Sequence, residues 1–298
     1  MSSVARQTDG DRPRGIRRNM EQADFKLSRS EFDSLSRAVY DHCGINLHDG
    51  KRELVEARLG KHIRQGGYQS AGAFIESVLN DRNGETFVRL IDTLSTNLTS
   101  FFREADHFTY LVREFLPRLI RDRKSSDQKR LRCWSAGCSS GEEPYTLGIV
   151  LQEAIPDLKQ WDARILATDI STRVLERAER GVYDAARISG VPPQLRTRYF
   201  ATNRYDGHVF FDALPSLRSL IAFRRLNLME TWPFSGPFDF IFCRNVMIYF
   251  DKPTQQALVN RFHSVLSPGG LLFTGHSESL TGVRHPFEYV RPTIYRKA

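Results

Sequence analysis

The stretch that decides the fold is Cys133-Trp-Ser-Ala-Gly-Cys-Ser-Ser-Gly-Glu-Glu-Pro-Tyr145. It begins within a short apolar run over 131–135 and ends at the start of a helical pattern over 144–153. Gly137 and Gly141 permit a tight turn and a close approach of the backbone to a ligand. In doubly wound α/β sheets, ligands bind at this carboxyl edge of the strands. The stretch therefore predicts a strand, a glycine loop and a helix that together face a ligand.

The rest of the C-terminal part alternates in the same way. Apolar runs at 164–168, 238–243 and 271–274 predict further strands, and helical patterns at 172–180 and 253–266 lie between them. Such alternation predicts a mostly parallel sheet covered by helices on both faces. The chain end over 287–295 is typical of a final strand or hairpin, and the region of about 199–225, which has no long helix, predicts a small β subdomain.

The N-terminal part shows helical periodicity only. Ser28-Arg-Ser-Glu31 before Phe32 is typical of a helix start, and the pairs Asp49-Gly50 and Gly66-Gly67 separate later helical patterns. We expect a disordered tail over 1–20, an all-helical domain over 21–94, a linker over 95–105 and an α/β domain over 106–298.

Composition narrows the function classes. The chain has 298 residues and a formal net charge of +8, which favours an acidic partner. No stretch approaches the roughly 18 apolar residues of a membrane helix, and the basic N-terminus has no apolar core after it. We therefore expect a cytoplasmic protein without membrane insertion. The four cysteines, Cys43, Cys133, Cys138 and Cys243, form no Cys-x-x-Cys pair, so we expect reduced, partly buried thiols and no metal.

A ligand class follows from the loop and the strand after it. Asp169 ends that strand about 30 residues on, where a carboxylate suits the hydroxyls of a ribose. The loop reads Gly-Cys-Ser-Ser-Gly and lacks the spacing of a dinucleotide fingerprint. Glu142 and Glu143 would instead suit the ammonium of an amino-acid moiety, such as that of a methyl donor. A glycine turn that only connects strand and helix remains the simpler alternative.

A hydrolase is a second alternative. Gly137-Cys-Ser139-Ser-Gly141 matches the nucleophile elbow of α/β-hydrolases, and Asp239 and His276 follow in the matching order. Against this, the 100 residues before the loop are helical, and no His-Gly-Gly-Gly-like oxyanion segment lies upstream.

Five separated motifs together resemble the chemotaxis receptor methyltransferase family (CheR type), from about Phe25 to Tyr295. They are Thr96–Glu104, Trp134–Tyr145, Ala167–Ile170, Ile241–Asp251 and Gly269–Glu278. The resemblance implies an all-helical N-terminal domain, a linker that contributes to the cofactor site, and a class I methyltransferase domain with a small β subdomain. The implied activity transfers a methyl group from S-adenosylmethionine to glutamate side chains of chemotaxis receptors and releases S-adenosylhomocysteine.

The resemblance also implies roles for individual residues. The residues that match cofactor contacts are Asn97, Thr99, Arg103, Glu142, Asp169, Asn227, Leu228, Arg244 and Asn245. Arg103 and Tyr249 match the reactive end, where we expect them to orient the substrate carboxylate and the methyl group. The acidic residue that precedes the glycine loop in many methyltransferases is Ser135 here, as in the family. A relative that binds the cofactor without turnover is an alternative.

The implied partner is the acidic, helical methylation region of a receptor. Lys51, Arg58 and Arg64 are the predicted receptor-binding residues, since Arg58, Lys61 and Arg64 follow one another at helical spacing. We expect a monomer that binds no nucleic acid. Some family members dock a receptor tail peptide on a longer, glycine-containing loop of the β subdomain; the short stretch Ala201–His208 predicts no dependence on such a peptide.

Overall fold

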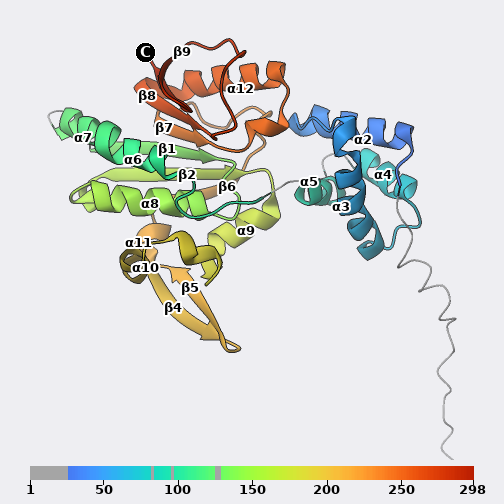
Figure 1. Cartoon of the computed structure of the whole chain (residues 1–298), viewed down its shortest axis with the longest axis horizontal. Coiled ribbons are helices and arrows are strands. Elements are labelled where there is room, and N and C mark those ends of the chain that lie inside the picture. Colours follow the sequence, from blue (N-terminus) through green and yellow to red (C-terminus); the bar gives the residue numbers. More distant parts are fainter. Residues whose placement is uncertain (1–25, 82–83, 95–96, 125–128) are drawn as a thin grey trace, which may run out of the picture. The chain divides into compact units, whose positions relative to one another are not determined.

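The computed structural model describes residues 26–81, 84–94, 97–124 and 129–298 (Figure 1). The predicted tail over 1–20 lies outside these residues. The chain forms two compact units, and the first contains the chain up to Leu35 together with His48–Leu94. The second contains Ser36–Leu47 and Ser95–Ala298.

The first unit is helical. Its elements are the start of α2 (Arg29–Cys43), the 3-10 turn η1 (Asp49–Lys51), α3 (Arg52–Gln65), α4 (Ala71–Asn80) and α5 (Glu85–Leu94). The Ser28 amide donates to Glu31 Oε2 at 2.7 Å and the Glu31 amide donates to Ser28 Oγ at 3.2 Å. This reciprocal capping box confirms the predicted helix start. In α3, Val55 is 2% exposed and Leu54 is 49% exposed, so Val55 lies on the buried face of the helix.

The second unit is built on a seven-stranded sheet in the order β6-β2-β1-β7-β8-β10-β9. The strands are β1 (Arg130–Ala136), β2 (Asp162–Asp169), β6 (Ile221–Arg225), β7 (Phe238–Cys243), β8 (Leu266–Thr274), β9 (Phe287–Arg291) and β10 (Ile294–Lys297). Strands β6, β2, β1, β7 and β8 run parallel to one another. Strand β10 lies between β8 and β9 and runs antiparallel to both. This is the expected doubly wound, mostly parallel sheet, with the predicted hairpin at the chain end.

Both faces of the sheet are covered. All six residues of β7 are buried, and alternate side chains point to opposite faces: Phe240 and Phe242 pack in one core, Ile241 and Cys243 in the other. A strand buried on both faces is a continuous apolar run, which is why the sequence showed it clearly. The first core lies under α6 (Ala105–Tyr110), the π-helical turn η2 (Leu111–Phe115), α7 (Leu116–Lys124) and α8 (Glu142–Ala154); the second lies under α12 (Lys252–Val265).

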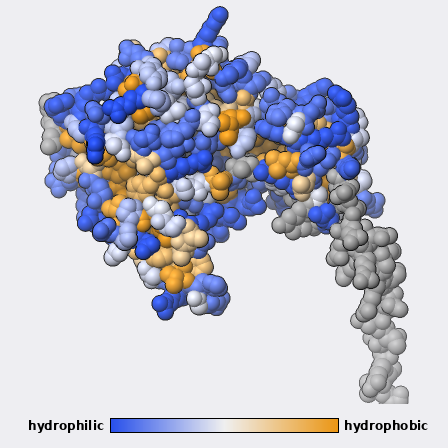
Figure 2. Space-filling model, viewed as in Figure 1, coloured by the Kyte–Doolittle hydropathy of each residue, from blue (hydrophilic) through white to orange (hydrophobic). Residues whose placement is uncertain are grey.

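A second, three-stranded antiparallel sheet forms the β subdomain, in the order β3-β5-β4. It comprises β3 (Val182–Asp184), β4 (Phe200–Tyr205) and β5 (His208–Ala213). The predicted range of about 199–225 is wrong at both ends. It missed β3, and it included residues 221–225, which form β6 and pair in parallel with β2. Val209, Phe210 and Phe211 of β5 are partly exposed, and hydrophobic residues reach the surface there (Figure 2).

The remaining helices connect these elements. They are α9 (Thr172–Arg180), α10 (Pro193–Tyr199), α11 (Pro215–Arg218) and the 3-10 turns η3 (Leu158–Gln160), η4 (Arg187–Gly190) and η5 (Met247–Tyr249). All four cysteines are free and buried, as expected, and burial raises the pKa of each thiol, that of Cys43 to about 12. Within the described ranges, no helix has the length and apolar character to cross a membrane.

Candidate cofactor and catalytic site

The glycine loop lies between β1 and α8. Gly137 and Gly141 have φ of +84° and +96°, a conformation that glycine adopts without steric cost. A Cβ on Gly137 would lie 2.3 Å from Val246 Cγ2, so a glycine at this position leaves room for the Val246 side chain. The amides of Gly137 and Cys138 donate to the Thr168 carbonyl at 2.8 and 2.9 Å. These amides are thus engaged within the protein rather than turned toward a ligand.

Asp169 ends β2 beside this loop. Its carboxylate accepts hydrogen bonds from the amides of Ser139 and Ser171, both at 2.9 Å, and the residue is 8% exposed. The two bonds fix the orientation of the carboxylate.

Glu142 opens α8 and is fully buried. Its carboxylate accepts from Ser140 Oγ at 2.8 Å and from Arg187 Nη1 at 2.7 Å. Burial raises the pKa of this carboxyl group, and the Ser140 and Arg187 contacts oppose the rise. Arg187, in η4, was not predicted as a site residue. Its side chain is 40% exposed, whereas that of Glu142 is fully buried.

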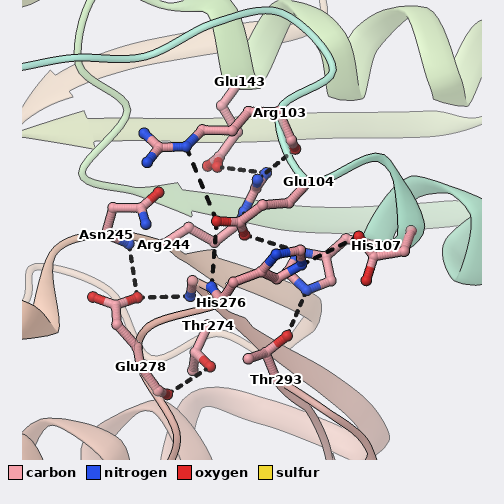
Figure 3. Close-up of polar contacts among 12 residues, drawn as sticks. Arg103, Glu104, His107, Glu143, Arg244, Asn245, Thr274, His276, Glu278 and Thr293 are labelled. Carbon is pink, nitrogen blue, oxygen red and sulfur yellow. Dashed lines mark hydrogen bonds and ion pairs between the residues drawn. The ribbon is translucent and has the colours of Figure 1, made fainter.

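Arg244, which directly follows β7, is 2% exposed at its side chain and lies at the centre of a polar network (Figure 3). Its guanidinium contacts Glu104 Oε2 at 3.1 Å and Glu143 Oε2 at 3.3 Å, and it also donates to the Arg103 carbonyl. Burial raises the pKa of Glu143. Burial is the largest single influence on Glu104 and opposes its charge, but Arg244 and the neighbouring His276 together outweigh burial, so the pKa of Glu104 is lowered. The geometry makes Arg244 a clamp between the segment 97–104 and α8, rather than a residue exposed to ligand.

The segment 97–104, predicted as a linker, is packed against the glycine loop. The Asn97 carbonyl accepts from Ser139 Oγ at 3.0 Å, and the Phe102 amide donates to Thr146 Oγ1 at 3.2 Å. Phe101 is buried, 4.9 Å from the Tyr183 ring. Thr99 is partly exposed. These contacts hold the segment at the carboxyl edge of the sheet.

Arg103 differs from Arg244 in its exposure. Its side chain is 36% exposed, and Nη1 donates to the Leu98 carbonyl at 2.9 Å. Because a guanidinium carries five N–H donors, most of them remain for a ligand carboxylate.

Asn227 and Leu228, which were predicted as cofactor contacts, are 2% and 8% exposed. Asn227 Nδ2 donates to the His42 carbonyl at 2.6 Å, and Oδ1 accepts from the Met229 amide at 3.0 Å. Leu228 packs in the core under α12. The Asn227 side chain therefore stabilises its own turn.

Asn245 and Tyr249 lie on the loop after β7. Asn245 has φ of +60°, and its amide donates to Glu278 Oε2 at 2.7 Å. The amides of Gly275 and Ile248 donate to the same carboxylate at 2.6 and 3.1 Å. Tyr249 is partly exposed in η5, where its carbonyl accepts from the Asn46 amide at 2.8 Å. Glu278 thus fixes the loop that carries Asn245 and Tyr249. It is the last residue of the motif Gly269–Glu278, whose sequence gave no indication of this role.

The geometry does not form the hydrolase triad. Ser139 Oγ donates to the Asn97 carbonyl, whereas Asp239 is the second residue of β7, at the opposite end of the strand from Arg244. Asp239 pairs with Arg123, and His276 Nε2 lies 3.2 Å from Asp106 Oδ1. The elbow pattern therefore arises from the glycine turn alone.

The predicted receptor-binding residues lie on η1 and α3 of the first unit. Arg64 is exposed and Lys51 is partly exposed. Arg58 is partly buried and donates to the Leu94 carbonyl at the end of α5, so part of its guanidinium stabilises this unit.

Fold and site together define a class I methyltransferase: a mostly parallel seven-stranded sheet with an antiparallel strand, a glycine loop after β1 and an aspartate that ends β2. Comparison with known families agrees. Residues 97–296 match the family model described as CheR methyltransferase, SAM binding domain, and residues 30–95 match CheR methyltransferase, all-alpha domain.

Curated relatives cover nearly the whole chain. The Chemotaxis protein methyltransferase of Borreliella burgdorferi is 39% identical, over 94% of this chain and 98% of the relative. Chemotaxis protein methyltransferase 2 of Pseudomonas aeruginosa is 38% identical (92% and 95%), and the Chemotaxis protein methyltransferase of Escherichia coli is 37% identical (90% and 91%). The chain belongs to the CheR methyltransferase family and is an S-adenosylmethionine-dependent methyltransferase.

Proposed function

We propose that the protein binds S-adenosylmethionine at the carboxyl edge of the large sheet, with Asp169 at the ribose and Glu142 at the ammonium. The observation that carries this is the meeting of four segments at one edge: the glycine loop, the end of β2, the segment 97–104 and the loop after β7. The amides of the glycine loop donate to groups of the protein itself. A dinucleotide would need free amides there to bind its pyrophosphate, so the loop fits a cofactor that has no pyrophosphate.

The proposed substrate group is a glutamate side chain of a chemotaxis receptor. A glutamate carboxylate is ionised at pH 7, so it needs no general base to act as a nucleophile. When bound, S-adenosylmethionine supplies a methyl group on a positively charged sulfur. Catalysis then rests on positioning and on partial removal of water from the nucleophile. Arg103 holds the incoming carboxylate through paired hydrogen bonds, and Tyr249 orients the reacting groups.

Docking of the receptor would use the first unit. Its α3 presents Arg64, and η1 presents Lys51, to an acidic helical surface. Arg58 contributes less, since part of its guanidinium serves the Leu94 carbonyl. The pairing is electrostatic and long-ranged, so it raises the rate of encounter more than the final affinity.

The β4–β5 hairpin supports independence from a receptor tail peptide. Its turn consists of Asp206 and Gly207, with φ of +48° and +76°, between the paired residues Tyr205 and His208. Such a two-residue turn leaves no loop to present to a peptide. Titration with a tail pentapeptide should give no heat, whereas micromolar binding that maps to residues 201–211 would contradict this expectation.

The function is tested by methylation of a purified cytoplasmic receptor fragment with labelled S-adenosylmethionine. We expect label on glutamate peptides, and release of the label as methanol at alkaline pH, because methyl esters hydrolyse there and methylated amines do not. Label that survives alkali would contradict a carboxylate substrate.

A calorimetric titration separates the binding-only alternative from the enzyme. Binding of cofactor without transfer to any receptor fragment would support a scaffold, and absence of binding would contradict the proposed site.

A further inference from the structure

A cluster of metal-binding side chains lies beside the Arg244 network. Glu104 precedes α6, His107 lies within α6, and His276 follows β8. Each offers one ligand atom, and these atoms lie within 4.8 Å of one another. Figure 3 shows the Glu104 carboxylate beside the two imidazole rings.

The hydrogen bonds of His107 define its tautomer. Its Nε2 lies 2.7 Å from Thr293 Oγ1, and the Thr293 hydroxyl donates to the Pro292 carbonyl at 2.6 Å. Because that hydroxyl proton is used, the oxygen accepts from His107, and Nε2 carries the ring proton. Nδ1 therefore carries a lone pair.

This lone pair is buried and faces another acceptor. His107 is fully buried, and Nδ1 has no hydrogen-bond partner among the described residues. It lies 3.6 Å from Glu104 Oε2. With the ring proton on Nε2, Nδ1 faces this carboxylate as a second acceptor and cannot donate to it. A cation between these two hydrogen-bond acceptors would stabilise both of them.

The third member is more exposed. The His276 side chain is 51% exposed, its ring centre lies 5.3 Å from that of His107, and its amide donates to Glu104 Oε1 at 3.3 Å. Asp106 lies 3.2 Å from its Nε2 and is exposed, so a further carboxylate flanks the open side. Arg244 contacts Glu104 Oε2 as well, and its charge lowers the affinity for any cation without filling every lone pair of the carboxylate.

We propose that Glu104, His107 and His276 form a binding site for a divalent transition-metal cation of the Zn²⁺ class. Two imidazoles and a carboxylate favour Zn²⁺, Co²⁺ or Ni²⁺ over Mg²⁺ and Ca²⁺, which prefer oxygen ligands. Ligand atoms about 2.0–2.2 Å from a tetrahedral zinc lie roughly 3.5 Å apart, close to the separation of His107 Nδ1 and Glu104 Oε2. Thr293 would hold the His107 ring in the ligating tautomer.

The test uses the full chain, freed of any affinity tag and of metal. Zn²⁺ is titrated calorimetrically, and Co²⁺ is followed by its visible absorption. We expect one equivalent of each to bind and Mg²⁺ to give no heat. His276→Ala should weaken Zn²⁺ binding at least tenfold, whereas His208→Ala, at an exposed histidine of the β4–β5 hairpin, should leave it unchanged.

Thr293→Val provides a second, independent variant. It removes the hydrogen-bond acceptor of His107 but no metal ligand, and loss of such a partner weakens metal affinity roughly 10- to 100-fold. Equal Zn²⁺ affinity in wild type and His276→Ala would overturn the proposal. So would several equivalents of weak binding that His208→Ala reduces as much as His276→Ala does.

Discussion

The two ends of the large sheet both bury charge, but they do so differently. At the amino end, Asp239 pairs with Arg123 and accepts from the Arg132 amide at 2.8 Å, so one carboxylate ties β7 to α7 and β1. At the carboxyl end lie four buried or nearly buried carboxylates, two of them paired with an arginine and two held by backbone amides. They belong to Glu142, Glu143, Asp169 and Glu278.

The difference indicates where function lies. Burying a charge costs several kcal/mol unless good partners offset the cost, so a fold gains little by gathering carboxylates for stability alone. The pKa values of Glu142, Glu143 and Glu278 are all raised by burial. Perturbed groups gathered at one edge are typical of a functional site, and this is the edge where doubly wound sheets bind ligands.

The largest expected effect on stability is that of Arg244→Ala. It leaves Glu104 and Glu143 buried without their shared partner, so we expect a loss of about 3–5 kcal/mol in the free energy of unfolding. Arg123→Ala, at the amino end, is the matched control. Arg123 is 24% exposed and Asp239 keeps the Arg132 amide, so the loss should be about 1–3 kcal/mol. Urea unfolding checks both, and a smaller loss for Arg244→Ala would reverse the comparison.

Arg103→Ala should separate activity from stability. The side chain is 36% exposed, bonds the Leu98 carbonyl and lies 4.0 Å from Glu104 Oε1, a weak ion pair, so the melting temperature should change little. Methyl transfer should fall about 100-fold if Arg103 positions the substrate carboxylate. Arg103→Lys keeps the charge without the paired donors and should recover only part of the rate. A variant that melts early but keeps normal specific activity would make Arg103 a structural residue.

Glu142→Gln tests burial through pH. Because burial raises the pKa of Glu142 above its unfolded value, the folded protein holds a proton more readily in the window above about 4.5. The stability that the Glu142 carboxyl group contributes is fully present at a pH below its pKa in the unfolded chain. It is lost as the pH rises through its pKa in the folded protein. The variant lacks this loss, so its stability relative to wild type should rise as the pH increases above about 4.5. Unfolding curves that show the opposite trend would mean that Arg187 outweighs burial.

The smallest expected effect concerns docking. Arg64→Glu should weaken receptor methylation by up to about fivefold, the scale of about 1 kcal/mol for exposed charges, and added salt should reduce the difference. Arg29→Glu, at another exposed arginine of the same unit, is the control. Equal, salt-independent rates for both variants would remove α3 from the docking surface.

Features that depend on residues close together in the sequence could be predicted, and features that depend on distant residues could not. The β1–loop–α8 unit, the Asp169 strand end and the capping box at Ser28 are local patterns, and each was found where it was predicted. The β subdomain was misplaced because short partly exposed strands carry weak periodicity, and only pairing assigns β6 to β2. Arg187 and His107 gave no signal, since their partners are distant in sequence and meet only in the folded chain.

The central claim is that the carboxyl edge binds the cofactor and the amino end does not. Its most direct test is a calorimetric titration of S-adenosylhomocysteine into Asp169→Ala and Asp239→Asn, well below the melting temperature of either. We expect Asp169→Ala to weaken binding by roughly 1.5–3 kcal/mol, about 10- to 150-fold, the scale of hydrogen bonds to a charged group. Asp239→Asn should keep the wild-type affinity despite a lower melting temperature. Unchanged affinity in Asp169→Ala, or an equal loss in both variants, would contradict the account.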